Sequence, residues 1–313
     1  MITSTNRLQL RLSRAVAAVR GHPLLTPLLI VYTAINVIAL PFEYRPSFAP
    51  VNLVLLIAYV SVIHFATAGR TMVASPLQRP NGRSRDVGLA ITVAVMQMTA
   101  ATVVWFVILP HGAPGALAAY LRSAGLPSLI AGRAVNAILT VALQLVPTAV
   151  AVAVFRVGLR DVGLTLGSRD LLLGLVLSAM AVGVGIGAAA AGTEPGLLWQ
   201  SVPAPIVAAV IALQSLVNGV PEEFAFRGVI FGRLMPWLGR PGNSLVVSTM
   251  AWGLLHVPFF VAGSHIPLWL AIPIGLFGTI QGLVFGYLFY RTRSIWPSAI
   301  WHTSISGLGL MFI

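Results

Sequence analysis

Residues 218–234 read NGVPEEFAFRGVIFGRL and place two adjacent glutamates, Glu222 and Glu223, inside a long apolar part of the chain. One ionised carboxylate at the centre of a lipid bilayer costs about 3 kcal/mol or more. An acidic pair in such a position indicates either a functional site or a buried polar network that holds helices together.

The composition of the whole chain is typical of a membrane protein. Hydrophobic residues make up 58% of the 313 residues and charged residues 8%, whereas a soluble domain carries about 25% charged residues. So little charge cannot cover a surface that faces water. The sequence therefore predicts an all-α, polytopic bundle of about eight or nine transmembrane helices. We expect residues 1–313 to form a single integral membrane domain, with the catalytic core helices in 200–313.

The charge pattern indicates how the chain is oriented in the membrane and which kinds of partner it has. The formal net charge is +12, and every basic residue other than histidine is arginine. The arginines gather in alternate loops, which predicts a cytoplasmic N-terminus and contact with membrane lipids. They form no basic patch with aromatic residues, so we expect no nucleic-acid partner. Abundant Ala, Gly and Arg without Lys suggest a bacterial cell membrane, and no stretch predicts an oligomeric state.

Apolar segments recur along the chain. The expected ranges are 24–40, 51–68, 87–109, 135–155, 171–191, 203–220, 244–262, 268–289 and 294–313. Residues 1–22 read as a retained cytoplasmic interfacial helix rather than a cleaved signal peptide. Residues 112–133 read as an external interfacial segment. The absence of cysteine excludes disulfides, thiolate metal sites and a cysteine nucleophile.

Helical spacing separates the two glutamates. Glu223 and Arg227 are four residues apart with the acid first, which favours an ion pair on one helix face. Glu222 is rotated by about 100° from Glu223, and its own neighbour one turn on is Phe226. It therefore needs a partner on another helix, a water, a metal or a proton. Pro221 should kink or restart the helix at this point.

Two histidines in other apolar segments can supply that partner. His256 lies in TMAWGLLHVPFF and His302 in SAIWHTSISG. At about 1.5 Å per residue, both come to a depth similar to that of Glu222. Three helices would thus bring ionisable groups together. His64 has no acidic neighbour, and we interpret it as a packing or hydrogen-bonded residue.

At these residues the chain resembles the CAAX-protease and bacteriocin-processing (CPBP) intramembrane proteases. That family includes the type II CAAX prenyl endopeptidases and the Abi proteins. PEEFAFRG matches its E-E-x-x-x-R motif, and His256 matches the histidine of its F-x-x-x-H motif, with Trp252 in place of phenylalanine. His302 matches the later histidine, and Ser306 stands where the family has asparagine or aspartate. The resemblance covers about the last third of the chain.

The resemblance implies an intramembrane endopeptidase that hydrolyses a peptide bond in membrane-associated peptides or protein tails. Glu222, helped by His256, would activate a water, and His302 would help to stabilise the oxyanion. Glu223, Arg227, Trp252 and Ser306 would support the site. Three alternatives stay open for the missing asparagine: Ser304 or Ser306 replaces it, a water intervenes, or the enzyme is impaired.

The sequence leaves two alternatives for the cofactor: no cofactor, or a zinc ion. Glu222, His256 and His302 could hold one Zn²⁺, but the H-E-x-x-H pattern is absent, and the metal-free reading is preferred.

Two other functions stay open on the sequence alone. The same acid and histidines could form the relay of a proton-coupled transporter. Alternatively, the chain could be a non-catalytic immunity or scaffold protein of the same fold, with Ser306 marking lost activity.

Overall fold

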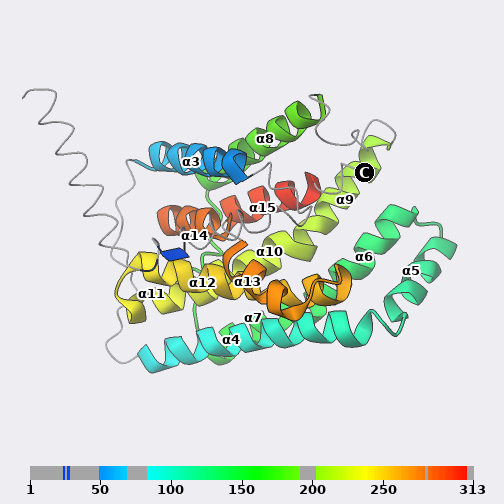
Figure 1. Ribbon diagram of the computed structural model, residues 1–313, viewed down its shortest axis with the longest axis horizontal. Coiled ribbons are helices and arrows are strands. Elements are labelled where there is room, and N and C mark those ends of the chain that lie inside the picture. The colour runs from blue at the N-terminus through cyan, green and yellow to red at the C-terminus, as the bar shows by residue number, and fades with distance from the viewer. Residues whose placement is uncertain are drawn as a thin grey trace, which may run out of the picture.

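The computed structural model describes residues 24, 27–28, 49–68, 83–190, 202–278 and 281–308, which form helices joined by turns and short loops (Figure 1). The all-α prediction is confirmed for this part of the chain. The expected helix over 1–22 lies outside the described residues, as does nearly all of the apolar segment 24–40.

The helices before the acidic pair come from the first two thirds of the chain. They are α3 (Ala49–Ala66), α4 (Arg83–Val103), η3 (Val104–Ile108), α5 (Ala113–Ser123), α6 (Ser128–Thr140), η4 (Val141–Leu145), α7 (Val146–Val154) and α8 (Ser168–Ala190), where η marks π-helical turns. The segment predicted to be interfacial, 112–133, forms the short α5 and then the first turns of α6. Its second part therefore belongs to a long helix.

The remaining helices carry the acidic pair and both candidate histidines. They are α9 (Ala204–Gln214), η6 (Ser215–Gly219), α10 (Val220–Glu222), η7 (Glu223–Phe231), α11 (Gly232–Leu238), α12 (Pro241–Leu255), η8 (Phe259–Gly263), α13 (Leu268–Gly278), α14 (Gln281–Thr292) and α15 (Trp296–Leu308).

Six helices within the described residues are long and apolar enough to cross a membrane. They are Ser84–Ile108, Ser128–Val154, Ser168–Gly187, Ala204–Leu238, Pro241–Gly263 and Leu268–Thr292. The expected count of eight or nine is not confirmed. The predicted segments 51–68 and 294–313 contain the 18-residue α3 and the 13-residue α15, neither of which is among these six. Residues 309–313 lie outside the described part of the chain.

The outer faces of the bundle are apolar. Phe65, Val154, Leu172 and Trp269 are each between 62% and 76% exposed. Large apolar side chains exposed to this extent on several helices are costly in water, whereas lipid tails solvate them without cost. With the six long apolar helices, this exposure identifies an integral membrane protein.

The helix that bears the acidic pair runs without a break from Ala204 to Leu238. The helix thus continues beyond the apolar segment 203–220, and Glu222 and Glu223 lie in the middle of its 35 residues. Pro221 does not end the helix. A proline lacks the amide hydrogen and crowds the preceding turn, and here π-turns precede and follow it, with Val220 N–H bonded to Ser215 O. Single π-turns are frequent at functional sites.

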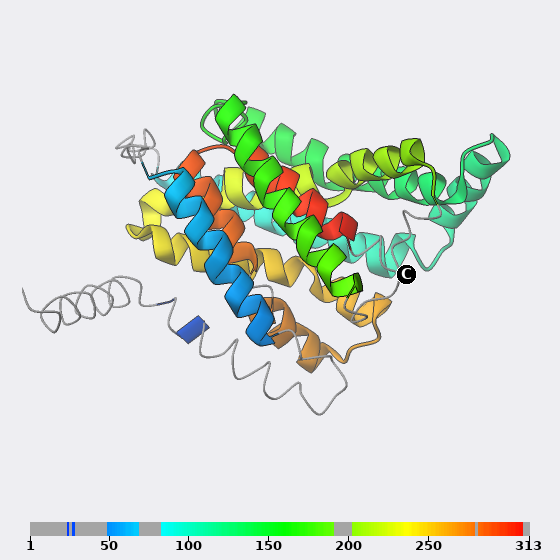
Figure 2. The same ribbon diagram turned by 90° about the horizontal axis from the view of Figure 1, so that it is seen from above.

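Small residues let helices of the bundle pack closely against each other. Figure 2 shows α3 and α8 side by side over α14 and α15. A Cβ on Gly174 of α8 would lie 3.0 Å from Pro297 Cα of α15. A Cβ on Gly219 would overlap Thr303 Oγ1 of α15 and lie 2.8 Å from Ala299 O. Glycine is required at both positions because the helices approach so closely, which is the packing that membrane helices favour.

Candidate active site

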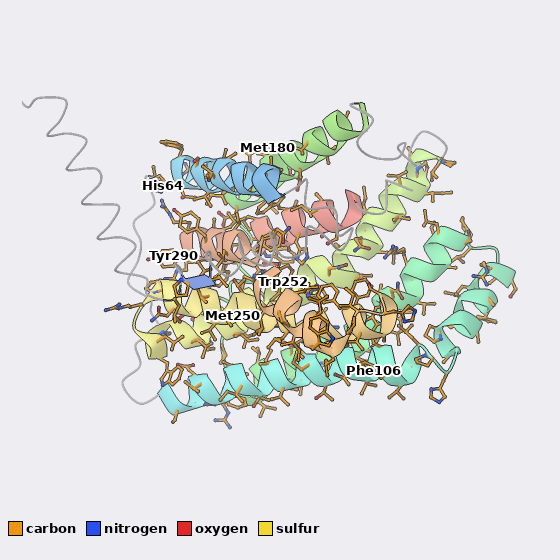
Figure 3. All side chains as sticks on the ribbon, viewed as in Figure 1. His64, Phe106, Met180, Met250, Trp252 and Tyr290 are labelled. Carbon is orange, nitrogen blue, oxygen red and sulfur yellow. The ribbon has the colours of Figure 1, made fainter. Side chains whose placement is uncertain are left out.

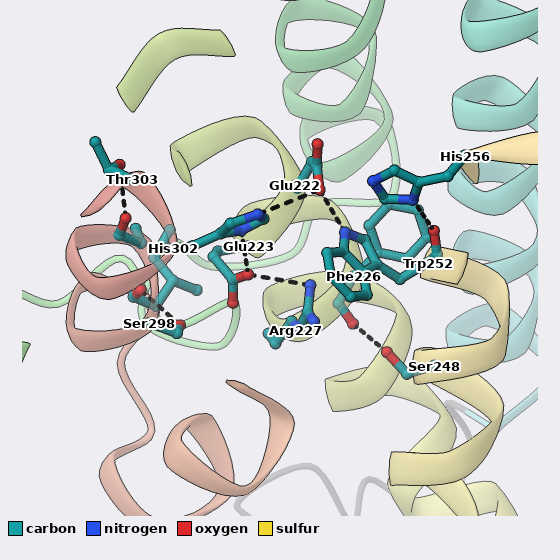
Figure 4. A network of polar contacts seen from close by, with 12 residues as sticks. Glu222, Glu223, Phe226, Arg227, Ser248, Trp252, His256, Ser298, His302 and Thr303 are labelled. Atoms are coloured by element: carbon teal, nitrogen blue, oxygen red, sulfur yellow. Dashed lines mark hydrogen bonds and ion pairs between the residues drawn. The ribbon is translucent and has the colours of Figure 1, made fainter. Parts of the chain in front are cut away.

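The polar centre of the bundle is formed by α10 and η7, α12 and α15 (Figure 4). Glu222, Glu223, Arg227 and His302 are 0% to 6% exposed, whereas His256 is partly exposed. Figure 3 places Trp252 near the middle of the bundle and His64 at its edge. Glu222 and His302 come within 3.8 Å of each other, whereas His256 is linked to Glu222 through Trp252.

Glu223 is fully buried and holds two partners through one oxygen. Its Oε1 lies 3.0 Å from Arg227 NH1, which confirms the ion pair predicted from the spacing. The same oxygen lies 3.0 Å from His302 Nδ1. Because a carboxylate only accepts, the hydrogen of His302 is on Nδ1 in this contact. Glu223 thus fixes the orientation of the His302 ring.

Arg227 is enclosed by aromatic rings rather than by further acceptors. Its guanidinium carbon lies 4.7 Å from the ring centroid of Trp252 and 5.1 Å from that of Phe285. Its terminal nitrogens have no well-aligned hydrogen bond among the described residues, although NH1 is close to Glu223. The contact with Glu223 is therefore electrostatic, and two π-faces supplement it.

Glu222 turns away from Arg227 and faces α12 and α15. Trp252 Nε1–H donates a hydrogen bond to Glu222 Oε2. His302 Nε2 lies 3.8 Å from the same oxygen, beyond hydrogen-bond distance. Glu222 Oε1 has no hydrogen-bond partner among the described residues. It nevertheless remains accessible to solvent, unlike the buried side-chain atoms that lack a hydrogen bond. This oxygen is thus available to a water or a substrate.

His256 is linked to Glu222 through Trp252 and not directly. Its Nδ1 lies 3.0 Å from the backbone oxygen of Trp252, one turn earlier in α12. Since a carbonyl only accepts, the hydrogen is on Nδ1, and neutral His256 keeps a lone pair on Nε2. Trp252 therefore contacts both groups: its indole N–H bonds to Glu222, and its backbone oxygen orients His256.

Aromatic rings fix the position of His302. It stacks on Phe285 with ring centroids 4.8 Å apart and an angle of 24° between the planes. Trp252 meets it edge-on at 5.5 Å. Phe285 in turn contacts Trp301, which contacts Tyr59 of α3. The sequence reasoning missed Phe285, because it lies in α14 and carries no polar signal.

The hydroxyl groups near His302 do not reach the site. Ser304 Oγ donates to Ile300 O, and Thr303 Oγ1 donates to Ala299 O, so both are bound to their own helix. Ser306 is partly exposed and makes no polar contact with the other described residues. Within the described part of the chain, neither Ser304 nor Ser306 replaces the missing amide.

The structure bears on a metal site in two ways. Both histidines use Nδ1 for a hydrogen bond and leave Nε2 available, which suits a metal ligand as well as a base. However, across the described ranges, no group of three His, Cys, Asp or Glu residues is arranged to hold one metal ion. Glu222, His256 and His302 as they stand thus do not form a coordination set.

His64 lies away from this centre and belongs to another contact. Its Nδ1 lies 3.1 Å from Tyr287 Oη and 3.1 Å from Arg291 NH1, both on α14. Arg291 NH2 also donates to Thr67 O. The interpretation of His64 as a hydrogen-bonded residue is confirmed, and the contact ties α3 to α14.

Comparison with known proteins gives one match. Residues 203–308 match the family model described as type II CAAX prenyl endopeptidase Rce1-like. Comparisons with curated proteins and with solved structures gave no significant match. The matched segment begins at α9 and ends with α15, so it contains all the residues of the polar centre described above.

Proposed function

Because residues 203–308 place the chain in the family of CAAX-type intramembrane proteases, as its motifs indicated, we propose that it is an endopeptidase that uses Glu222 and His256 to activate water. The observation that carries this proposal is the pair of acceptors left open in the polar centre. Glu222 keeps Oε1 and His256 keeps Nε2, while their other polar atoms are held by Trp252.

The chemistry follows from these two acceptors. A water that donates to Glu222 Oε1 and His256 Nε2 attacks the carbonyl carbon of the scissile peptide bond, and its proton moves to one of the two groups. That proton then passes to the leaving amine as the C–N bond breaks. General acid–base assistance of this kind contributes about 10²- to 10⁴-fold in rate. No metal is required by these steps.

The neighbouring residues position this pair. Arg227 and Glu223 hold His302, and His302 with Trp252 limits the rotation of Glu222. The role expected for His302 at the oxyanion requires a hydrogen on Nε2, because its Nδ1–H already points to Glu223. The substrate class is a peptide or protein tail that lies in or beside the membrane, since the site is inside an apolar bundle.

The test is cleavage by the purified protein. The wild type in lipid nanodiscs is incubated with a pool of membrane-anchored peptides, and products are identified by mass spectrometry. We expect hydrolysed products with the wild type and none with Glu222→Gln, which keeps the shape but not the charge. Equal product from both proteins would remove Glu222 from the reaction.

The metal question has its own measurement. Metal content of the purified protein is determined by mass spectrometry, and cleavage is repeated after chelation. We expect less than one zinc per chain and unchanged cleavage after chelation. One zinc per chain together with loss of cleavage that added zinc restores would replace the metal-free mechanism.

A further inference from the structure

A line of polar side chains runs along the central helix towards Glu222. Arg133 NH1 of α6 donates to Gln214 Oε1 at 3.2 Å. Gln214 Nε2 then donates to Asn218 Oδ1. Gln214 is 3% exposed, and its contacts with Arg133 and Asn218 are partly buried where α6 meets α9. These three residues lie outside the motifs that the sequence analysis used.

The arginine fixes the direction of the two amides. A guanidinium has donors only, so Gln214 must present its oxygen to Arg133 and its NH₂ group to Asn218. Asn218 must then accept through Oδ1, which leaves its own NH₂ group as the last donor. That group donates to no acceptor in the described ranges, and Asn218 is partly exposed. The orientation follows from donor chemistry and not from the assignment of one amide atom.

Asn218 lies beside the proposed reaction centre. It precedes Glu222 by four residues in the same helix, so the two side chains share a face with Cβ atoms about 5–6 Å apart. The contact between Gln214 and Asn218 shows that residues four apart do meet on this face across η6. On its other side the helix meets α15 at Gly219.

Among the described residues, the other donors of the polar centre are either bound or shut off from solvent. Trp252 Nε1–H is bound to Glu222, and the terminal nitrogens of Arg227, which is paired with Glu223, are buried without access to solvent. His302 Nδ1–H is bound to Glu223, and the hydroxyl groups of Thr303 and Ser304 are bound to backbone. Hydrolysis of a peptide bond nevertheless develops a negative oxygen that a preset donor must stabilise.

We propose that Asn218 is a further catalytic residue, whose side-chain NH₂ group, oriented through Gln214 by Arg133, stabilises the oxyanion formed at the Glu222 site. The inference rests on the proposed function. Asn218 touches the reacting carbonyl oxygen, whereas Gln214 and Arg133 are positioning residues. The donor thus comes from the helix of the acidic pair, and the loss of the amide at Ser306 is compensated.

The test compares Asn218→Asp with the wild type in the cleavage assay. Aspartate keeps the size and the acceptor for Gln214 but has no donor, so kcat falls about 10²- to 10³-fold with KM and melting temperature unchanged. Gln214→Glu keeps the contact with Arg133 and removes the donor to Asn218, so it lowers kcat less. Asn136→Ala, which removes an exposed amide from α6, is the matched control and keeps wild-type kcat.

A rescue separates catalysis from folding. In the Asn218→Ala background, Ser306→Asn supplies an amide from α15, one turn beyond His302, and raises kcat about tenfold or more. A purely structural role for Asn218 would give no rescue. Wild-type kcat in Asn218→Asp, or no rescue by Ser306→Asn, overturns the inference while the proposed function stands. No cleavage by the wild type overturns both.

Discussion

Glu222 and Glu223 are joined by one peptide bond, yet they occupy different environments. Glu223 is fully buried, and its Oε1 holds both Arg227 and His302 at 3.0 Å. Glu222 retains slight exposure, is held by one neutral donor from Trp252, and keeps Oε1 open. The difference shows that two adjacent acids, whose side chains point about 100° apart on one helix, can have different contacts and different roles.

The same contrast extends to the two histidines. His302 is buried, with one nitrogen bound to Glu223 and its ring stacked on Phe285. His256 is partly exposed, and its hydrogen bond within the described residues goes to a backbone carbonyl. We therefore assign His302 to the closed half of the site with Glu223, and His256 to the open half with Glu222. The following changes test this division.

The largest effect is expected at the open half. His256→Ala removes one of the two open acceptors, so cleavage falls about 10²- to 10⁴-fold. The melting temperature in detergent stays at the wild-type value, because the lost hydrogen bond goes only to Trp252 O of the same helix. His64→Ala is the control at a histidine far from the site, and full activity of His256→Ala would refute the assignment.

Substitutions in the closed half should lower the free energy of unfolding. Glu223→Leu leaves Arg227 buried without its counter-charge, which costs about 3–5 kcal/mol in the free energy of unfolding. Adding Arg227→Met removes the stranded charge and restores most of that loss. Reversible unfolding in mixed micelles measures both variants. If the double variant is no more stable than Glu223→Leu alone, the pair does not act as a unit.

A smaller effect is expected where the two halves meet. Trp252→Phe keeps the ring that packs on Arg227 and His302 but removes the donor to Glu222. A hydrogen bond to a charged group is worth about 1.5–3 kcal/mol, so cleavage should fall about ten- to a hundredfold.

Trp301→Phe is the matched control for that change. Its buried indole contacts Tyr59 and Phe285 rather than Glu222, so Trp301→Phe should retain activity. Equal kcat in the wild type and in Trp252→Phe would show that the indole does not position Glu222.

The smallest effect concerns the contact that brings α15 to the central helix. Gly219→Ala would push against Thr303 Oγ1 and Ala299 O, and overpacking of this kind costs about 1–3 kcal/mol. We expect a lower melting temperature with activity reduced only in proportion to unfolding. Gly187→Ala, where a Cβ meets open space, should leave the melting temperature unchanged. Equal melting temperatures for both variants would contradict the close packing.

Part of this site could be predicted from the sequence because it depends on local geometry. Four-residue spacing predicted the pair of Glu223 and Arg227, and composition predicted a helical membrane protein. The need of Glu222 for a partner on another helix followed from the lack of one on its own. These inferences require only the helical repeat and the cost of burying charge.

Other features could not be predicted because they depend on how helices rotate against each other. The sequence showed that Trp252 adds a donor but not that its acceptor is Glu222. The relay from Arg133 through Gln214 to Asn218 joins residues 81 positions apart. The count of eight or nine spans is not confirmed by the six long apolar helices of the described residues. The continuation of the central helix through Pro221 depends on π-turns, which helical periodicity does not reveal.

The central claim is the division of labour between the two adjacent acids, and one paired measurement tests it. Glu222→Gln and Glu223→Gln are purified in parallel, and cleavage and melting temperature are measured for each. We predict that Glu222→Gln melts like the wild type but does not cleave, and that Glu223→Gln melts at a clearly lower temperature. The reverse pattern, with cleavage retained by Glu222→Gln, would contradict the account.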